Sequence, residues 1–416
     1  MGIATSAAQG RVILGIGGGI AAYKVCEVAS TLAKAGVEVI PIMTTAAQEF
    51  VTPLTFATLC RHPAYTDRDF WSAAQSRPLH IEVGETADLL VLAPLTANTL
   101  GKLTHGLADN LLTNTVLASR CPVLLVPAMN TDMWQQQSVR RNWGKLLSDS
   151  RYHAIAPGTG RLACDRVGQG RLAEPTEIIA HIDSLLLTQG KRDLAGKHVL
   201  ISAGSTREYL DPVRFIGNPS TGKMGVALAQ AANHRGATVT LVHGPMAAEH
   251  RQGLTSVQQV AIKTAEEMQQ AMVANLPQAD WIIMAAAVAD VSPRDRAATK
   301  LPKASLPEAL PLLTVPDIAA QLSTIKSDRQ VLVGFAAQTG DIEPPARRKL
   351  TQKGLDAIVA NPIDQANSGF GSDCNQAILL SRTGEKLVVP SSSKRHLAHA
   401  VFDFVTQMDC SGRHAG

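Results

Sequence analysis

The residues best suited to chemistry lie in one stretch near the middle of the chain, 204–225 (GSTREYLDPVRFIGNPSTGKMG). This stretch opens with Gly204-Ser205-Thr206 and closes with Ser220-Thr221-Gly222-Lys223. A segment rich in Gly, Ser and Thr exchanges regular structure for exposed backbone N–H groups and hydroxyls, which suits phosphate binding where a strand meets a helix N-terminus. The apolar residues at 226–232 predict that helix. A long surface loop is the alternative, although loops of this length without structure of their own are uncommon.

The composition is that of an ordinary globular protein with two or three domains. Of the 416 residues, 45% are hydrophobic and 18% are charged, and the formal net charge of +4 comes without a long basic run. This balance does not favour nucleic-acid binding but is compatible with small anionic substrates. Six scattered cysteines without a CxxC pair indicate a reduced, cytoplasmic protein without disulfides or structural zinc. With no signal-peptide pattern and no apolar run of 18 residues, neither secretion nor membrane insertion is expected.

The first half begins as a doubly wound α/β domain. An apolar strand at 11–16 runs into Gly17-Gly18-Gly19, a helix is expected over 20–35, and a second strand is expected over 37–43. The glycine triplet is tighter than the GxGxxG of dinucleotide-binding proteins, and the second strand ends in Thr44-Thr45 instead of an acidic residue. Two hydroxyls at a strand end suit a phosphate or a flavin edge better than a dinucleotide ribose.

Two further strands of this half, at 88–93 and 123–126, end in polar turns that contain Thr96-Ala97-Asn98 and Asn130. Ligands of open α/β sheets collect beyond the carboxyl ends of the strands. We therefore expect these turns to share one crevice with the glycine triplet and the threonine pair. The four glycines of residues 158–171 indicate a flap.

The second half repeats this architecture after a linker expected at 184–197. Six strands are expected at 198–202, 237–243, 280–286, 330–336, 356–360 and 377–381. A final helix is expected at 394–405.

Motifs distributed over nearly the whole chain carry a specific resemblance. In the first half they are GGGIAAYK (17–24), LHIE (79–82), ADLLVLAPLTANTLGKLTHGLADNLL (87–112), PAMNTDMW (127–134) and LAC…GQGR (162–171). In the second half they are SAGSTREYLDPVRFIGNPSTGKMG (202–225), AAAVADVSP (285–293), KLPK (300–303), VGFAAQT (333–339) and KGLDAIVAN (353–361). The sequence resembles the bifunctional phosphopantothenoylcysteine decarboxylase / phosphopantothenate–cysteine ligase family of coenzyme A biosynthesis.

This resemblance implies two domains and two consecutive reactions. Residues 1–190 are expected to form a flavodoxin-like, FMN-dependent decarboxylase, and residues 191–416 a Rossmann-like, CTP-dependent ligase. The ligase would join L-cysteine to 4′-phosphopantothenate through an acyl-cytidylate. The decarboxylase would then convert 4′-phosphopantothenoylcysteine to 4′-phosphopantetheine. The family also implies a homo-oligomer, based on trimers and extending to dodecamers.

For decarboxylation, the resemblance implies that the cysteine thiol is first oxidised to a thioaldehyde, which provides an electron sink for the loss of CO₂. His80 matches the family histidine assigned to thiol oxidation, Asn130 the residue that binds the substrate carboxylate, and Cys164 the acid that protonates the ene-thiolate. The flap departs from the family pattern, in which glycine follows the cysteine, because Asp165-Arg166 follows here. The implied FMN contacts are Gly18, Gly19, Thr44, Thr96 and Asn98.

For ligation, the resemblance implies that Arg214 and Asn218 handle the acyl-cytidylate and that Lys300 helps to form it. The family's Lys-x-Lys-Lys motif reads Lys300-Leu301-Pro302-Lys303, so one lysine is lost. Mg²⁺ is expected to bridge the triphosphate, but the sequence contains no strong metal cage. The implied CTP contacts are Met284, Ala285, Ala286, Asp290, Lys300, Pro316, Asp317, Ile318, Ala319, Phe335, Lys349 and Lys353.

Three other interpretations remain open at this point. An NAD-dependent dehydrogenase could use a doubly wound sheet, although GxGxxG and the strand-end acid are missing. A non-catalytic binding or regulatory subunit is disfavoured because His80, Asn130 and Cys164 occur together. Finally, the altered flap and lysine motif leave open that only one half is active.

Overall fold

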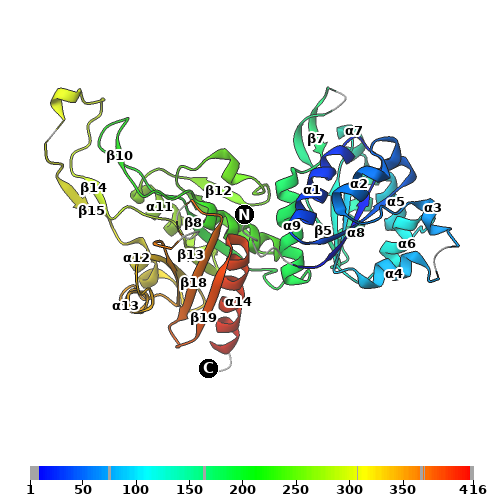
Figure 1. Cartoon of the computed structure of the whole chain (residues 1–416). Coiled ribbons are helices and arrows are strands. Elements are labelled where there is room, and N and C mark those ends of the chain that lie inside the picture. Colours follow the sequence, from blue (N-terminus) through cyan, green and yellow to red (C-terminus); the bar gives the residue numbers. More distant parts are fainter. Residues whose placement is uncertain are drawn as a thin grey trace. The chain divides into compact units, whose positions relative to one another are not determined.

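The computed structural model describes residues 9–73, 76–162, 165–306, 308–365, 369 and 371–412. Contacts divide the chain into two compact units, Met1–Lys191 and Arg192–Gly416. Each unit has its own sheet and its own hydrophobic cores (Figure 1).

The N-terminal unit is built on a five-stranded sheet in the order β2-β1-β3-β4-β5, in which every pairing is parallel. Its strands are β1 (Arg11–Ile16), β2 (Glu38–Met43), β3 (Leu89–Leu95), β4 (Val123–Pro127) and β5 (Tyr152–Ala154). This is the flavodoxin-like order 2-1-3-4-5, with its switch point between β1 and β3. It confirms the fold expected for this half.

Helices cover both faces of this sheet because its strands are apolar on both sides. Val12 and Leu14 of β1 belong to one core with α1, α2 and α9, whereas Ile13 belongs to a second core with α4, α5, α6 and α8. A separate hairpin pairs β6 with β7. These elements are α1 (Ala22–Lys34), α2 (Pro53–Cys60), α3 (Asp67–Phe70), α4 (Leu79–Thr86), α5 (Ala97–His105), α6 (Leu111–Ala118), α7 (Thr131–Gln135), α8 (Gln137–Leu147), α9 (Pro175–Thr188), β6 (Gly158–Arg161) and β7 (Val167–Arg171).

The linker expected at 184–197 is wrong at its start, because α9 continues to Thr188. Ser184 and Leu185 are 0% and 2% exposed, so this part of the segment packs into the N-terminal unit. The leucines that follow Ser184 extend the apolar face of the helix.

The C-terminal unit has an eight-stranded sheet in the order β12-β11-β8-β13-β16-β17-β18-β19. The first six strands are parallel and follow the Rossmann order 3-2-1-4-5-6, and β18 and β19 add an antiparallel hairpin. The expected Rossmann-like fold is therefore confirmed. The strands are β8 (His198–Ala203), β11 (Thr238–His243), β12 (Gln258–Ala261), β13 (Trp281–Met284), β16 (Val331–Gln338), β17 (Ala357–Pro362), β18 (Cys374–Ser381) and β19 (Lys386–Ser393).

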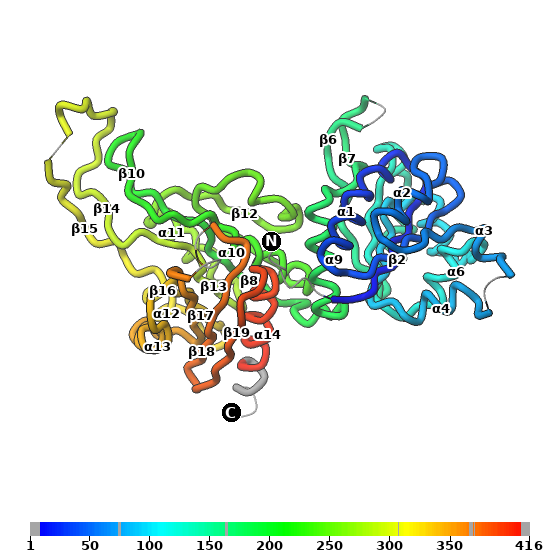
Figure 2. The backbone as a smooth tube through the Cα atoms, viewed as in Figure 1, coloured from blue at the N-terminus to red at the C-terminus, as the bar shows by residue number. Residues whose placement is uncertain are grey.

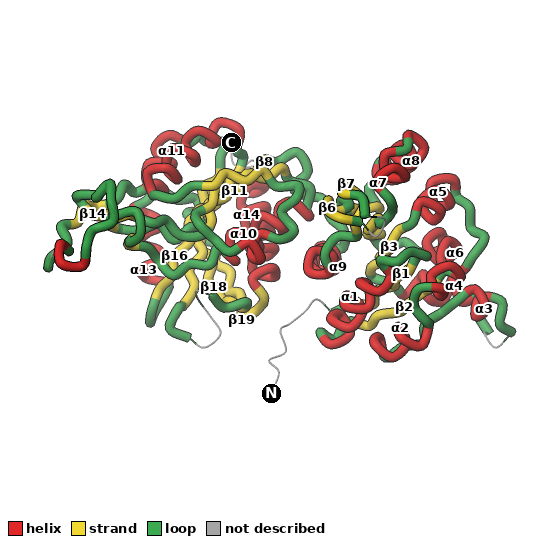
Figure 3. The backbone as a smooth tube through the Cα atoms, turned by 90° about the horizontal axis from the view of Figure 1, so that it is seen from above, coloured by secondary structure: helices red, strands yellow, loops and turns green. Residues whose placement is uncertain are grey.

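Helices also flank both faces of the second sheet (Figure 3). Val199 and Ile201 of β8 pack with α10 and α14, and Leu200 packs with α11, α12 and α13 on the opposite face. The helices are α10 (Lys223–His234), α11 (Ala265–Asn275), α12 (Ile318–Ile325), α13 (Glu343–Gln352) and α14 (Lys394–Gly412).

Two short antiparallel pairs lie outside this sheet. They are β9 (Glu208–Tyr209) with β10 (Phe215–Ile216), and β14 (Val291–Pro293) with β15 (Leu312–Thr314). The pairs lie side by side, since β14 contacts both β9 and β10 (Figure 2). The stretch 204–225 therefore keeps some regular structure, contrary to the expectation from its composition.

Arg235 follows α10 and joins the start of the C-terminal unit to its last helix. Its Nε donates to Asp193 (2.8 Å) and its Nη1 pairs with Asp403 (2.8 Å) and donates to the carbonyl of His399 (3.2 Å). Burial opposes the charge, but the two carboxylates outweigh it and raise the pKa of Arg235. The residue is 2% exposed, so these contacts satisfy a cation that is almost fully buried.

We predict that His399 makes the C-terminal unit sensitive to acid. The residue is 4% exposed, and burial, followed by the charge of Arg235, lowers its pKa to about 3. An unfolded histidine titrates near pH 6.5, so the unfolded state takes up a proton first as the pH falls. This stability is complete above about pH 6.5 and declines toward pH 3, with a loss of about 2 kcal/mol between pH 7 and pH 5.

Calorimetric unfolding of the wild type and of His399→Asn at pH 7 and pH 5 measures this contribution. The variant should lose less stability over this interval than the wild type does. Equal losses in the two proteins would contradict the assignment.

Candidate functional site

The N-terminal unit has a cavity of about 650 Å³ at the carboxyl edge of its sheet. The loop after β1, the turn after β3, residues 128–133 and the β6–β7 hairpin line it. Gly18, Gly19, Thr96 and Asn130, which the sequence predicts as site residues, are among the lining residues. The structure therefore brings together residues from three strand ends and the flap, as expected for ligands of a doubly wound sheet.

The glycine triplet allows the backbone to approach its neighbours closely. A Cβ atom at Gly17 would lie 2.4 Å from the carbonyl oxygen of Pro94, and one at Gly18 would lie 2.4 Å from the Cβ of Ala46. A Cβ at Gly19 would meet nothing within 4 Å, so this glycine borders open space. The N-terminus of α1 follows without a side-chain cap. A tight turn, an open side and the positive end of a helix together fit the phosphate of a flavin nucleotide.

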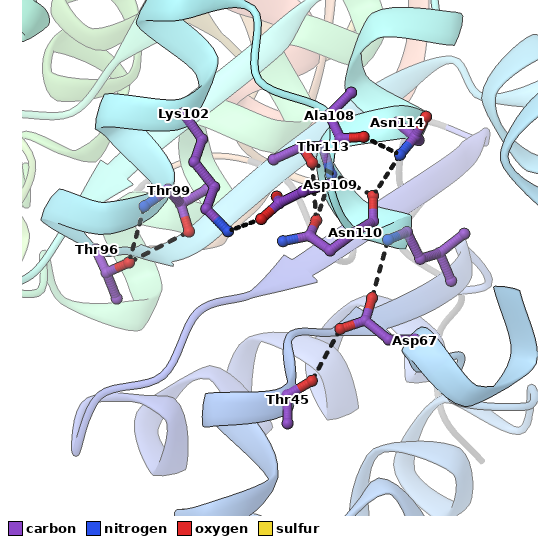
Figure 4. A network of polar contacts seen from close by, with 11 residues as sticks. Thr45, Asp67, Thr96, Thr99, Lys102, Ala108, Asp109, Asn110, Thr113 and Asn114 are labelled. Atoms are coloured by element: carbon purple, nitrogen blue, oxygen red, sulfur yellow. Dashed lines mark hydrogen bonds and ion pairs between the residues drawn. The ribbon is translucent and has the colours of Figure 1, made fainter.

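Short polar contacts fix the loops around this edge (Figure 4). Thr96 caps α5 by accepting from the N–H of Thr99 (3.3 Å), and Asn110 caps α6 by accepting from the N–H of Thr113 (2.9 Å). Asp67 accepts from Thr45 Oγ1 and from the backbone N–H at the start of α6, both at 2.9 Å. Thr45 is thus engaged in holding the fold together.

An ion pair completes the same network. Lys102 Nζ lies 2.7 Å from Asp109 Oδ2, and this hydrogen bond lowers the pKa of the carboxyl group (Figure 4). The pair joins the end of α5 to the loop before α6.

The flap is docked on the segment that carries Asn130. The N–H of Met129 donates to the carbonyl of Gly170 (3.0 Å), and Trp134 Nε1 donates to Gln169 (3.2 Å). Arg166 forms an ion pair with Asp132 in α7. Asn130 itself caps α7 by accepting from the N–H of Asp132 (2.8 Å).

Thr44, Asn98 and His80 do not line the cavity that the described residues delimit. Thr44 caps the 3-10 helix Thr45–Glu49, and Asn98 is an exposed residue of α5. His80 lies on α4 and makes an edge contact with Phe70 (5.4 Å between ring centroids), and its buried Nδ1 has no partner among the described residues. Cys164 lies outside the described residues. The roles of all four stay predictions.

The C-terminal unit has a cavity of about 520 Å³ at the carboxyl edge of the second sheet. Asn218 lines it, together with all the predicted nucleotide-binding residues except Lys300. These are Met284, Ala285, Ala286, Asp290, Pro316, Asp317, Ile318, Ala319, Phe335, Lys349 and Lys353.

Individual contacts show how the elements present these side chains. Asn218 Nδ2 donates to the carbonyls of Ala287 (3.3 Å) and Val288 (3.0 Å), which ties the stretch 204–225 to the loop after β13. Asp317 caps α12 and pairs with Lys353 at 3.0 Å. The loops after β8 and β13 and residues of strand β16 itself therefore converge on one cavity.

Arg214 and Lys300 lie outside this cavity, but a residue that the sequence interpretation missed connects them. Asp211 is buried, and its carboxylate accepts from the N–H groups of Val213 and Arg214 (both 2.8 Å), from Arg214 Nη1 (2.9 Å) and from the N–H of Leu301 (3.2 Å). Burial raises the pKa of Asp211, but these donors outweigh it and hold the pKa below its ordinary value. The spacing in the sequence could have indicated this role. Asp211 precedes Val213 by two residues and Arg214 by three, and an aspartate accepts from N–H groups at these distances in an Asx turn.

Two lysines of the cavity were also missed as site residues. Lys223 lies in the quoted stretch but received no role, and Lys394 begins the last helix. In the described part of the chain, no group of three or more His, Cys, Asp or Glu side chains is placed to hold a metal. No helix among the described residues is long and apolar enough to cross a membrane.

Comparison with known families agrees with this geometry. Residues 4–187 match the family model described as flavoprotein, and residues 194–408 match that of the DNA/pantothenate metabolism flavoprotein C-terminal domain. The fold and the two sites thus define a protein with a flavoprotein domain followed by a pantothenate-metabolism domain.

Full-length relatives narrow this class. The chain is 42% identical over 398 residues to the coenzyme A biosynthesis bifunctional protein CoaBC of Bacillus subtilis, and the match covers 96% of this chain and 97% of that protein. The protein of the same name from Escherichia coli K12 is 38% identical over 420 residues, with 98% and 100% covered. A crystal structure of the C-terminal domain of a CoaBC protein is 34% identical, covers 52% of this chain and 96% of that chain, and has a TM-score of 0.44.

The chain belongs to the family of bifunctional coenzyme A biosynthesis proteins. This membership replaces the dehydrogenase and the non-catalytic interpretations that the sequence left open.

We predict that Asp211→Ala releases the segment that contains Lys300. The N–H of Leu301 would lose its acceptor, and the guanidinium of Arg214 would lose its buried partner. Hydrogen exchange followed by mass spectrometry should show several-fold faster exchange in peptides that contain Leu301 and Arg214. Asp328→Ala, in the loop before β16, serves as the control and should leave these peptides unchanged. Unchanged exchange in Asp211→Ala would contradict the clamp.

Proposed function

We propose that residues 191–416 join L-cysteine to 4′-phosphopantothenate and that residues 1–190 decarboxylate the product to 4′-phosphopantetheine. The single observation that carries this proposal is the C-terminal cavity, which gathers Asn218 with the residues predicted to contact CTP. Family membership over the full length supports both reactions and their combination in one chain.

For ligation, the carboxylate of 4′-phosphopantothenate attacks the α-phosphate of CTP and releases pyrophosphate. The amine of cysteine then attacks the acyl-cytidylate and displaces CMP. Such chemistry depends on positioning and on neutralising negative charge. The cavity contributes lysine side chains and the loop after β13, where Asn218 is fixed by two backbone carbonyls. Mg²⁺ would come with the triphosphate, since such ions are usually bound through substrate phosphates and few protein ligands.

For decarboxylation, the N-terminal cavity is proposed to hold FMN at the glycine triplet and the start of α1. When bound, the flavin would supply reversible two-electron chemistry, which takes two electrons from the substrate thiol and returns them after CO₂ has left, so that the product carries a thiol again. Asn130 borders the cavity and is proposed to bind the substrate carboxylate through its neutral amide. Cys164 is proposed to protonate the ene-thiolate, because a thiol with an ordinary pKa near 8.5 is largely protonated at neutral pH.

His80 is proposed to act on the substrate thiol, and its position favours an assembly of several chains. Within one chain it does not line the cavity, although its buried Nδ1 has no partner among the described residues. Large apolar side chains are exposed at the cavity rim, including Ile20 (58%), Tyr23 (59%) and Met133 (47%). Such a surface is typical of an interface. The trimer-based homo-oligomer that we propose would cover it.

A cytoplasmic location belongs to the same proposal. Cys26, Cys60, Cys121 and Cys374 are free thiols, which suits a reducing compartment.

We predict that substitutions separate the two activities. His80→Asn should abolish the release of CO₂ and leave ligation intact, because His80 lies in the flavoprotein domain. Asn218→Asp and Lys300→Gln should reduce ligation by about 100-fold or more and leave decarboxylation of supplied 4′-phosphopantothenoylcysteine unchanged.

One mass-spectrometric time course tests the whole scheme. The protein receives 4′-phosphopantothenate, L-cysteine, Mg²⁺ and CTP, and the expected products are the cysteine adduct and then a species lighter by CO₂. Formation of the adduct alone would show an active ligase with an inactive decarboxylase. Absence of both products would overturn the proposal.

A further inference from the structure

Two lysines without a role so far lie at the same end of the C-terminal cavity. Lys223 is the first residue of α10, Lys394 is the first residue of α14, and both side chains line the cavity. They come from helices at opposite ends of the unit's sequence, so their proximity is a product of the fold. Both reach toward the residues just before β18.

The two ammonium groups bind three backbone carbonyls and one carboxylate of the segment before β18. Lys223 Nζ donates to the carbonyl of Gly371 (3.2 Å) and to Asp373 Oδ1 (2.7 Å). Lys394 Nζ donates to the carbonyls of Gly369 (3.3 Å) and Ser372. An ammonium group has three donors, and the contacts within the described residues use two from each lysine. One N–H of each therefore has no partner there.

Positive charge at this end is poorly compensated. Lys394 is 8% exposed, and burial, followed by the charge of Lys223, lowers its pKa. The side chain of Asp373, the one carboxylate bound to the pair among the described residues, is 82% exposed, so water screens it. The described lining of the cavity contains four lysines against two aspartates, Asp290 and Asp317. An anion in the cavity would relieve the repulsion between the two ammonium groups.

The backbone adds to the positive electrostatic potential at this end of the cavity. Helix α10 has twelve residues and begins at Lys223 without a side-chain cap, after Gly222 at φ +78°. Its N-terminal end carries the equivalent of a partial positive charge. The hydroxyl residues Ser220 and Thr221 line the cavity beside it.

We propose that Lys223 and Lys394 form a phosphate anchor that holds the β- and γ-phosphates of the nucleoside triphosphate and then the departing pyrophosphate. The proposal rests on the ligase function given above. The α-phosphate and the cytidine would lie toward the loop after β13 and the Asp317–Lys353 pair. The phosphate of the pantothenate substrate has the same chemistry, but a pair of ammonium groups matches two linked phosphates better than one.

The test uses Lys223→Met and Lys394→Met in the full-length protein, because methionine keeps the apolar stem and removes the charge. Lys386→Met is the control, since Lys386 pairs with Glu343 at 2.6 Å outside the cavity. Calorimetry gives the Kd for inorganic pyrophosphate and for CMP, and steady-state assays give the KM for CTP and for the phosphorylated pantothenate substrate. A lost hydrogen bond to a charged group corresponds to about tenfold or more in binding.

The expected result is a pyrophosphate Kd and a CTP KM raised about tenfold or more in both variants, with the CMP Kd unchanged and the control like the wild type. If only the KM for the phosphorylated pantothenate substrate rises, the assignment to the triphosphate is overturned and the substrate phosphate belongs there instead. Loss of CMP binding together with a lower Tm would show a purely structural role and overturn the anchor. Variants that match the wild type in all these constants would also overturn it.

Failure of the anchor and failure of the ligase function give different results. If the wild type ligates and the variants bind pyrophosphate normally, the proposed anchor is overturned and the proposed ligase function stands. If the wild type does not ligate but binds pyrophosphate through these lysines, the proposed anchor stands and the proposed ligase function is overturned.

Discussion

Both units depend on one constraint, that parallel strands end together at one edge of the sheet. At the switch point the chain leaves two neighbouring strands in opposite directions, and the edge between them stays open. In the N-terminal unit, the N–H of Gly17 donates to the carbonyl of Pro94 (3.2 Å), which joins the loop after β1 to the end of β3. In the C-terminal unit, the N–H of Ala287 donates to the carbonyl of Gly204 (2.8 Å) and joins the loops after β8 and β13. Each cavity forms beside such a junction.

The two cavities use this edge for different chemistry. The N-terminal cavity is bordered by apolar side chains such as Ile20 and Met133 and by a tight glycine turn, which suits a flat ring system with one phosphate. The C-terminal cavity contains four lysines, which suits a triphosphate and charged intermediates. One architecture therefore serves two kinds of chemistry. The redox reaction needs a site that excludes water, and the activation of a carboxylate by a nucleotide needs side chains that neutralise the negative charge of the phosphates.

The sequence predicted the buried strands well because a parallel strand covered on both faces reads as a continuous apolar run, as in residues 11–16 and 281–284. It missed β5, β9, β10, β14 and β15, since strands of two or three residues leave no periodic signal. It also missed β6, β7, β12 and β19, because most of their residues are not buried and form no continuous apolar run. Motifs placed Asn218 at the cavity, but they carry no information on distance. The position of Lys300 outside the cavity, and its link to Asp211 through Leu301, follow from the tertiary fold alone.

The aspartate at position 165, where the family resemblance leads us to expect glycine, has a consequence for the backbone. Asp165 takes φ +62°, a left-handed conformation that glycine adopts without strain. A side chain there costs about 1–2 kcal/mol, although aspartate tolerates this conformation better than most residues. The ion pairs Arg161–Asp165 and Arg166–Asp132 join side chains that are at least 60% exposed, and such pairs contribute about 0–1 kcal/mol each.

These pairs can therefore offset the backbone strain but cannot by themselves hold the flap in place. The close approach of Gly168 and Gly170 to the Asn130 segment does more. A Cβ at Gly168 would lie 2.5 Å from Thr131 Oγ1, and one at Gly170 would lie 2.2 Å from the carbonyl of Met129. The backbone hydrogen bond between Met129 and Gly170 forms within this contact. Docking of the flap thus depends on Gly168 and Gly170, so the residues at Asp165-Arg166 leave the cavity wall intact.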